Sequence, residues 1–250
     1  MPIVAKKSLG QNFLHDINFK TKIRDTVKLS YLDHGDLPLL EIGPGVGDLT
    51  EMFLEFQPNL KMVELDADLI PILEQKFPKN KIICDDFMNI LPNIERSYLV
   101  SNLPYYIGSR LVIDLIAYNQ RMPFSFILQK EVVLKTKKTS KITFFGGVLN
   151  YFYDIKINFT IPPSAFKPAP KVHSALFTGV PKETNIDGIK AINIFKAMFF
   201  KPTKSLFNNL IFGGFERGLV KEIFKKNSWD PNLRVRWENY EYIFETILNS

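Results

Sequence analysis

Hydrophobic and polar positions divide the first half of the chain into short, largely apolar runs separated by amphipathic stretches. The runs lie at residues 39–42, 60–65, 81–84, 98–101 and 124–129. Their length and composition predict buried strands. Upstream of the first run, apolar residues recur every four positions from Phe19 to Tyr31, which predicts an amphipathic helix. Strands that alternate with helices predict an α/β fold with a mostly parallel sheet.

The pattern changes in the middle of the chain. Residues 142–153 predict a helix, and strict alternation over residues 154–161 predicts a half-buried strand. A proline-rich connection then leads to residues 173–177. We expect these residues to return as an antiparallel neighbour of the alternating strand.

A polar break separates the last predicted strand from a helical remainder. Residues 181–188 form this break, and an apolar stripe over residues 240–248 predicts a helix near the end of the chain. The sequence therefore predicts two domains, with a boundary after residue 181. Residues 1–181 would form the larger, cofactor-binding domain, and residues 182–250 a small helical domain.

A glycine-rich turn joins the first predicted strand to the next helix. Gly43, Gly45 and Gly47 let the backbone turn sharply and approach a ligand closely, because no Cβ stands in the way. The dinucleotide fingerprint would require glycine where Asp48 stands. The G-x-G-x-G spacing, with Pro44 inside it, instead favours an enzyme that uses S-adenosylmethionine (SAM). A structural turn without a ligand is the competing interpretation, and the flexibility cost of three glycines disfavours it.

Carboxylates follow the second and third predicted strands. Glu64 lies about 20 residues after the glycine turn, where an acid at a strand end can accept hydrogen bonds from two ribose hydroxyls. The alternative role, capping the following helix, we assign to Asp66. After the third strand, Asp85 or Asp86 could accept a hydrogen bond from an adenine amino group. A solvated acidic turn is equally compatible with this spacing.

The fourth predicted strand is followed at once by Asn102-Leu103-Pro104-Tyr105. This pattern is typical of enzymes that methylate exocyclic amines. We expect the Asn102 amide oxygen and the Leu103 carbonyl to accept the two N–H groups of an adenine amine, because Pro104 fixes the backbone between them. Tyr105 would stack on the extruded base. An ordinary Asn-Pro turn is the competing interpretation, and the glycine turn upstream disfavours it.

The charge of the chain adds an indication of its partner. The 250 residues are 46% hydrophobic, enough for a large core, and carry a formal net charge of +6. Such a balance favours a polyanionic partner. Lysines gather in residues 135–141 and, together with arginine, in residues 196–226. These clusters are candidates for phosphate contacts, with a solvated surface as the competing interpretation.

Cysteine and hydropathy exclude several classes of protein. Cys84 is the only cysteine, which excludes a disulfide framework and a cysteine-based metal site and suits a reducing compartment. His173 has no second metal-type ligand near it in the sequence, so we expect no metal. No apolar run approaches the ~18 residues that a membrane helix requires. We therefore expect a cytoplasmic protein without a membrane partner.

With these residues in view, the chain resembles the small-subunit ribosomal RNA adenine N6,N6-dimethyltransferases. The resemblance runs nearly from end to end. The stretches that carry it are Gly10-Gln11-Asn12-Phe13-Leu14, Glu41-Ile42-Gly43-Pro44-Gly45, Glu64-Leu65-Asp66, Asn102-Leu103-Pro104-Tyr105, Gln129-Lys130-Glu131-Val132, Pro163-Ser164-Ala165-Phe166 and residues 200–210. The resemblance implies a Rossmann-like SAM-dependent methyltransferase sheet, with an antiparallel strand pair at its end and a small C-terminal helical domain.

The resemblance also implies roles for individual residues. Cofactor contacts are implied for Gln11, Asn12, Leu14, Gly43, Gly45, Glu64, Asp86 and Asn102. It favours Asp86 over Asp85 as the partner of the adenine, and it implies that Asn102 lies between cofactor and target base. RNA contacts are expected from Lys135, Lys137, Lys138, Lys201 and Lys204.

Three positions depart from the pattern of these enzymes. Gly108 stands where a serine is usual, which implies a looser base pocket. Lys135 replaces a usual arginine and cannot bind a phosphate in the planar, bidentate manner of a guanidinium. The segment 200–210 holds fewer arginines than is usual.

The activity that the resemblance implies is dimethylation of two adjacent adenosines in the hairpin loop near the 3′ end of small-subunit rRNA. SAM is the expected cofactor, and the expected partner is this rRNA within a pre-30S-type particle, bound by a monomer. One alternative is a large-subunit rRNA adenine methyltransferase of the macrolide-resistance type, which residues 163–175 and 200–210 disfavour. Another is a ribosome-assembly or transcription factor without catalysis. The intact Asn102, Pro104 and Tyr105 disfavour that reading.

Overall fold

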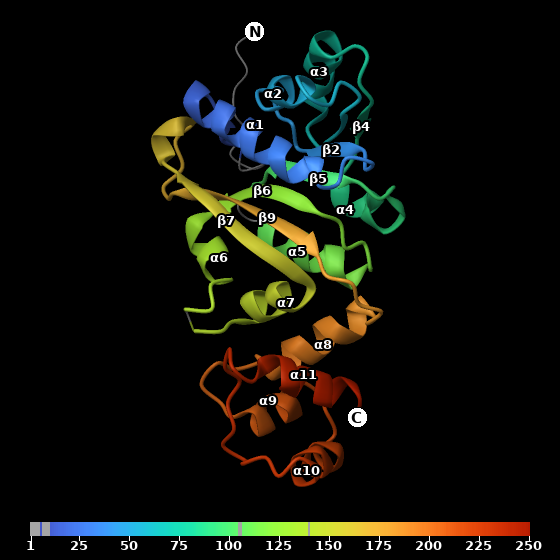
Figure 1. Cartoon of the computed structure of the whole chain (residues 1–250), viewed down its shortest axis with the longest axis vertical. Coiled ribbons are helices and arrows are strands. Elements are labelled where there is room, and N and C mark those ends of the chain that lie inside the picture. The colour runs from blue at the N-terminus through green and yellow to red at the C-terminus, as the bar shows by residue number, and fades with distance from the viewer. Residues whose placement is uncertain (1–5, 7–10, 105–106, 140) are drawn as a thin grey trace. The chain divides into compact units, whose positions relative to one another are not determined.

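The chain folds into two compact units, each assembled from three segments. The computed structural model describes residue 6 and residues 11–104, 107–139 and 141–250 (Figure 1). Unit 1 consists of Met1–Leu111, Gln120–Val133 and Ile155–Pro181. Unit 2 consists of Val112–Asn119, Leu134–Asp154 and Lys182–Ser250. The chain therefore passes between the units several times before Pro181, whereas the sequence predicted a single change there.

A seven-stranded mixed sheet forms the centre of unit 1. Its strands are β2 (Leu39–Ile42), β3 (Lys61–Glu64), β4 (Ile82–Cys84), β5 (Tyr98–Asn102), β6 (Phe124–Gln129), β7 (Tyr153–Ile161) and β9 (Ser174–Pro181). Their order is β4-β3-β2-β5-β6-β9-β7. The first five of these are parallel to one another, and β9 runs antiparallel to β6. The predicted mostly parallel sheet with an antiparallel pair is confirmed, and β9 is the neighbour of β7, as expected.

Helices pack their apolar faces against this sheet. In unit 1 they include α1 (Ile17–Leu32), α2 (Thr50–Leu54), α3 (Ile70–Lys76), α4 (Phe87–Ile90) and α6 (Lys130–Leu134). The carboxylate of Asp16 caps α1 by accepting two backbone N–H groups. The helix buries Ile23, Val27 and Tyr31 in the core, which confirms the predicted amphipathic face. None of the described helices is long and apolar enough to cross a membrane.

A small second sheet fixes the N-terminal segment of unit 1. Strand β1 (Phe13–Leu14) pairs antiparallel with β8 (Phe166–Lys167). The backbone N–H of His15 donates to the carbonyl of Ala165 at 2.9 Å, and the Leu14 side chain is buried. The segment that precedes α1 is therefore anchored to the proline-rich connection rather than left in solvent.

Unit 2 is a helical assembly. It contains the end of α5 (Gly108–Ala117), together with α7 (Phe144–Phe152), α8 (Gly188–Met198), α9 (Leu206–Phe212), α10 (Arg217–Lys226) and α11 (Tyr240–Leu248). Figure 1 shows α8 to α11 as the orange and red helices. The ring of Phe195 stacks on that of Phe244 at 4.4 Å, and Tyr151 meets Phe244 edge-on at 4.5 Å between centroids. Because α7 supplies part of this aromatic core, residues 134–154 group with the C-terminal helices.

Candidate active site

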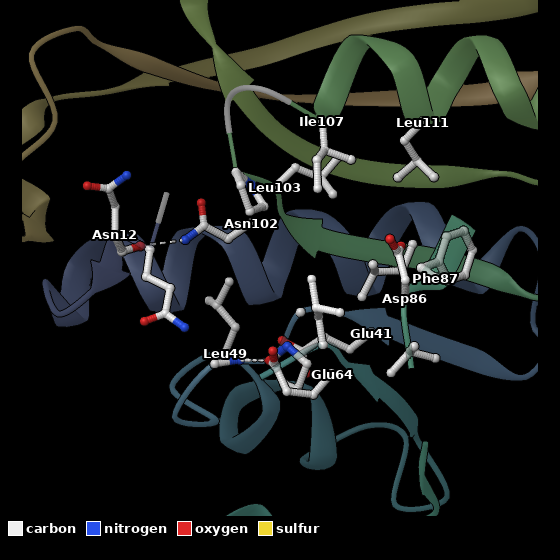
Figure 2. A pocket seen from close by; sticks show the side chains of 18 of the residues that line it. Asn12, Glu41, Leu49, Glu64, Asp86, Phe87, Asn102, Leu103, Ile107 and Leu111 are labelled. Carbon is white, nitrogen blue, oxygen red and sulfur yellow. Dashed lines mark hydrogen bonds between the residues drawn. The ribbon is translucent and has the colours of Figure 1, made fainter. Parts of the chain in front are cut away.

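A pocket in unit 1 lies where β2, β3 and β5 end (Figure 2). Parallel strands bring their carboxyl ends to one edge of the sheet. Gly43 follows β2, while Glu64 and Asn102 are the last residues of β3 and β5. Except for Tyr105, which lies outside the described residues, every predicted catalytic or cofactor-binding residue lines this pocket. These residues are Gln11, Asn12, Leu14, Gly43, Gly45, Glu64, Asp86, Asn102, Leu103 and Pro104.

The glycine turn forms one wall of the pocket with an unusual backbone conformation. Gly43 and Gly45 have φ angles of 64° and 62°, in the left-handed region that side chains disfavour. A Cβ at Gly43 would meet no atom within 4 Å, whereas one at Gly45 would lie 2.9 Å from the ring of Phe13. Gly43 therefore leaves open space beside the backbone, and Gly45 is required by its packing as well as by its conformation.

Two backbone groups hold the Glu64 carboxylate in one orientation. The N–H of Gly45 donates to Oε2 at 3.0 Å, and the N–H of Asp66 donates to Oε1 at 2.8 Å. Burial raises the pKa of Glu64 above its ordinary value, and these two hydrogen bonds act in the opposite direction. Each carboxylate oxygen has a further lone pair, so the side chain retains acceptor capacity for a ligand.

Glu41 lies in the same pocket and was missed by the sequence analysis as a site residue. Its side chain is buried, and its Oε2 accepts a hydrogen bond from the Thr50 hydroxyl at 2.6 Å. Burial raises the pKa of Glu41 to about 8. A charged residue inside the apolar run Leu39–Ile42, directly before the glycine turn, was the signal that could have identified it.

A contact from the N-terminal segment orients the Asn102 amide. Its Nδ2 donates to the backbone carbonyl of Asn12 at 2.9 Å, the dashed line between these two residues in Figure 2. The amide is planar, so this bond fixes which way the acceptor Oδ1 points. The backbone N–H of Leu103 donates to the carbonyl of Ile127 at 3.2 Å, which ties the next residue to β6. The start of the Asn-Leu-Pro stretch is thus held from both sides.

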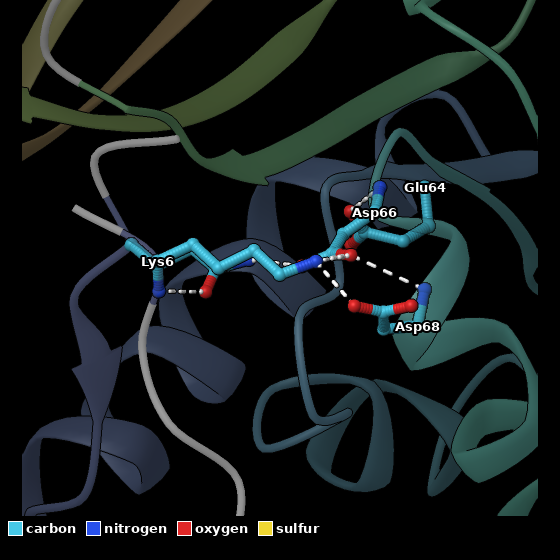
Figure 3. Close-up of polar contacts among 5 residues, drawn as sticks. Lys6, Glu64, Asp66 and Asp68 are labelled. Carbon is cyan, nitrogen blue, oxygen red and sulfur yellow. Dashed lines mark hydrogen bonds and ion pairs between the residues drawn. The ribbon is translucent and has the colours of Figure 1, made fainter. Parts of the chain in front are cut away.

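A polar cluster fastens the N-terminal segment beside Glu64 (Figure 3). Lys6 Nζ lies 2.6 Å from a carboxylate oxygen of Asp66 and 2.6 Å from one of Asp68. Gln11 Nε2 donates to Asp66 at 2.9 Å, and its Oε1 accepts from the backbone N–H of Lys6 at 2.8 Å. Burial opposes ionisation of Asp66, yet the bonds from Lys6 and Gln11 hold its pKa below the ordinary value.

The two acids after β4 make different local hydrogen bonds. Asp86 caps α4 by accepting from the N–H of Met88 at 2.9 Å. Asp85 accepts from the N–H of Asp86 at 2.7 Å and from the Asn89 side chain at 3.0 Å. Both line the pocket, so the choice of Asp86 for the adenine stays a prediction. The predicted cap at Asp66 is confirmed, because its carboxylate accepts from the N–H of Asp68.

Comparison with known proteins decides the family. Residues 4–235 match the family model described as ribosomal RNA adenine dimethylase. The chain belongs to this family. Among its relatives, the ribosomal RNA small subunit methyltransferase A of a Sulfurihydrogenibium species is 33% identical and covers 99% of this chain and 98% of its own length. The protein with the same name from Francisella tularensis subsp. novicida is 35% identical over 91% of this chain and 88% of its own.

Solved structures share the fold of this dimethylase family member. The 23S rRNA methyltransferase ErmE has a TM-score of 0.68 and 23% identity, covering 96% of this chain and all of its own. A dimethyladenosine transferase from Plasmodium falciparum has a TM-score of 0.65 and 20% identity, covering 93% of this chain and 87% of its own. At these identities the likeness concerns the fold alone.

One departure from the dimethylase pattern has a structural answer. Gly108, which is expected to loosen the base pocket, packs against a large side chain. A Cβ at Gly108 would overlap the side chain of Leu128, which takes up that space. The side chain of Leu128 therefore occupies the space that a side chain at position 108 would need.

The lysines predicted to bind RNA all belong to unit 2 and are exposed. They are Lys135, Lys137, Lys138, Lys201 and Lys204. Lys201 Nζ lies 4.7 Å from the centre of the Phe212 ring, a cation–π contact. Across the described residues, no group of three or more His, Cys, Asp or Glu side chains is arranged to bind a metal.

Proposed function

We propose that the protein dimethylates two adjacent adenosines, at N6, in the 3′-terminal hairpin loop of small-subunit rRNA during ribosome assembly. The proposal is supported by relatives more than 30% identical over nearly the whole chain, which are named small-subunit rRNA methyltransferases. We further propose that it acts in the cytoplasm, as a monomer, on rRNA within a pre-30S-type particle. Residues 182–250, with Lys201 and Lys204, would contact that RNA. Lys135, Lys137 and Lys138 would extend the contact.

The described pocket fits SAM as the methyl donor. The open space beside Gly43 allows a ligand to approach the backbone closely, and the oriented Glu64 carboxylate can accept hydrogen bonds from two ribose hydroxyls. Asp86 would accept from the adenine amine, while Gln11, Asn12, Leu14 and Gly45 would complete the wall. When bound, SAM supplies an electrophilic methyl group on a positively charged sulfur.

The orientation of Asn102 carries the catalytic part of the proposal. Because Nδ2 is bonded to Asn12, Oδ1 is the atom left to accept an N–H of the target amine. The lone pair of an adenine amine is delocalised into the ring, which makes the nitrogen a poor nucleophile. Acceptors at Asn102 Oδ1 and the Leu103 carbonyl would favour a pyramidal nitrogen and stabilise the charge that develops on it. Pro104 would fix the backbone, and Tyr105 would stack on the base.

The experiment compares Asn102→Ala with a matched control. We expect single-turnover methyl transfer to fall by about 10²–10³, the usual effect of removing one preorganised group. RNA affinity should stay near that of the parent, because phosphate contacts supply most of it. The control is Asn158→Ala, an asparagine on β7 outside the pocket, which should keep the parent rate. Tyr105→Ala should lose both turnover and roughly 1–3 kcal/mol of binding. Parent-like transfer by Asn102→Ala would overturn the catalytic assignment.

Mapping the product separates this function from its alternatives. Dimethyladenosine at two adjacent positions of small-subunit rRNA, present only with the enzyme, supports the proposal. The same mark on large-subunit rRNA would assign the protein to the macrolide-resistance type. RNA binding with no mark on either RNA would assign it to assembly or transcription factors without catalysis.

A further inference from the structure

A second pocket lies entirely within unit 2, apart from the residues that line the candidate active site. It has a volume of about 510 Å³, within the range of small-molecule sites. Its wall is formed by the start of α7, the end of α8 and the segment that precedes α11. The two lysine clusters of the sequence each contribute one member, Lys141 and Lys204.

The rim of this pocket is strongly cationic. Lys141, Lys204, Arg234 and Arg236 line it and are exposed. The one acid in the lining is Glu238, 3.7 Å from Arg236, and both side chains of this pair are 69% exposed. Lys141, Lys204 and Arg234 form no ion pair with any acid of the described residues. The rim therefore carries an excess of positive charge that the protein itself does not neutralise.

The interior offers aromatic surface. Phe144, Phe199 and Trp237 line the pocket and are half-buried. Asn209 also lines it, but its Oδ1 accepts from the N–H of Lys201 and its Nδ2 donates to the carbonyl of Met198. Because the Asn209 amide is hydrogen-bonded to the backbone, the pocket presents aromatic rings in its interior and cations at its rim. Proteins that bind single-stranded nucleic acid combine these two features.

We propose that this pocket holds one unpaired nucleotide of the RNA substrate. The phosphate would lie among the cations of the rim, and the base would lie against the aromatic wall. This inference rests on the proposed function, because it takes the ligand to be part of the substrate RNA. The same chemistry would accept a free nucleoside monophosphate, so the test separates the two sources.

Two sets of variants probe the two halves of the site. Trp237→Leu keeps an apolar side chain but removes the ring, and should weaken binding of protein-free rRNA roughly 5- to 100-fold. Its slope of log affinity against log salt should stay unchanged. The double variant Arg234→Gln/Arg236→Gln should instead lower that slope by about 0.7–1.4. Trp237→Phe, which restores an aromatic ring, should recover most of the affinity lost in Trp237→Leu.

The controls separate the effect of this pocket from a general loss of positive charge and from misfolding. Lys79→Gln/Arg96→Gln removes two exposed cations from unit 1, outside both pockets, and should bind RNA like the parent. SAM affinity, measured by calorimetry, should be unchanged in every variant, because no lining residue is shared with the candidate active site.

The remaining outcomes overturn the inference. Pocket variants that bind protein-free rRNA like the control would overturn it. A loss of affinity for the assembled particle alone would also overturn it, because that result would indicate a protein partner. Adenosine monophosphate that still binds beside saturating RNA, and is lost in Trp237→Leu, would assign the pocket to a free nucleotide.

Failure of the proposed function is a separate result. A parent enzyme that leaves small-subunit rRNA unmethylated would refute the proposed function, whereas RNA binding by the pocket variants would still test the second pocket.

Discussion

Glu41 and Glu64 are buried carboxylates in one pocket with different hydrogen-bond partners. Glu41 has the Thr50 hydroxyl, and Glu64 has two backbone N–H groups. Burial is the largest influence on both, and raises the pKa of Glu41 to about 8. At neutral pH Glu41 is therefore mostly protonated. Burial thus raises the pKa of both acids, and the backbone N–H groups at Glu64 act against that rise.

The raised pKa of Glu41 predicts a dependence of stability on pH. The folded state binds the Glu41 proton more tightly than the unfolded state does. This difference stabilises the folded state at low pH, and the stabilisation is lost as the pH rises towards about 8. Relative to Glu41→Gln, the parent's free energy of unfolding should fall by up to about 1.4 kcal/mol per pH unit between pH 5 and 8. Denaturant titrations of both proteins measure this difference. Parallel pH profiles would contradict it.

Glu64 provides a prediction about the cofactor. Glu64→Ala should weaken SAM binding by roughly 1–3 kcal/mol, the scale for loss of a charged hydrogen-bond acceptor. Calorimetry on the folded variant is the measurement. Glu74→Ala removes an exposed acid on α3, away from the pocket, and should bind SAM like the parent. Unchanged affinity in Glu64→Ala would rule out the ribose assignment.

At the scale of elements, the segment before α1 is held at three places. Lys6 and Gln11 bind Asp66, the Asn12 carbonyl receives the Asn102 amide, and β1 pairs with β8. All three places involve residues that line the candidate active site. Residues 11–14 thus form a wall of the pocket, and polar contacts with Asp66 after β3 and with Asn102 of β5 help to fix its position.

Lys6 tests this dependence. Lys6→Gln removes both ion pairs, and we expect SAM affinity to fall roughly two- to fivefold, because the Lys6 side chain is exposed to solvent, which weakens its ion pairs. Raising the salt concentration should weaken binding by the parent more than by the variant. Lys28→Gln, an exposed lysine on α1 without an ion pair among the described residues, is the control. Equal salt dependence in all three proteins would show that the ion pairs do not support the pocket.

At the scale of the whole molecule, unit 2 takes its core from distant parts of the chain. The rings of Tyr151, Phe195 and Phe244 pack together, although α7 precedes β7 and α11 ends the chain. Gly188 lies against the backbone of Ile116 in α5, with no room there for a Cβ. Residues 182–250 thus complete a unit that earlier segments begin.

Truncation after residue 181 should therefore damage more than RNA binding. The fragment 1–181 retains α7 without the helices that cover it, so we expect a lower thermal transition and binding of a hydrophobic dye. In the full chain, Phe244→Ala should cost roughly 3–5 kcal/mol of stability, the usual range for a buried phenylalanine. A fragment that melts cooperatively at the parent's temperature without binding the dye would show that residues 1–181 fold independently.

The sequence was sufficient for the sheet and for most of the pocket. Apolar runs defined the strands, and residues at strand ends converge because parallel strands end at one edge. The apolar run around Glu41 indicated that this acid is unusual, but not that its side chain faces the pocket. The Lys6 contacts join residues about 60 positions apart, and spacing along the chain carries no information about such pairs.

The grouping of residues 134–154 with the C-terminal helices could not be predicted from the sequence, for a different reason. The pattern of residues 142–153 predicts a helix, but α7 is buried over most of its surface, and an apolar helix does not specify which neighbour covers it. Its partners are helices that follow the polar break after Pro181. A boundary placed at a change of composition therefore separated elements that pack together.

The packing of α7 under the last helix has a consequence during synthesis. Tyr151 of α7, whose ring packs on Phe244, is made about 90 residues before that partner, so at roughly 5–20 residues per second it waits roughly 5–20 seconds for it. During this interval the nascent chain presents the apolar surface of an unfinished helical unit to the crowded exterior of the ribosome. Chaperones that recognise exposed apolar segments would have their clearest target in α7. The exposure of α7 ends when the final helix emerges from the exit tunnel.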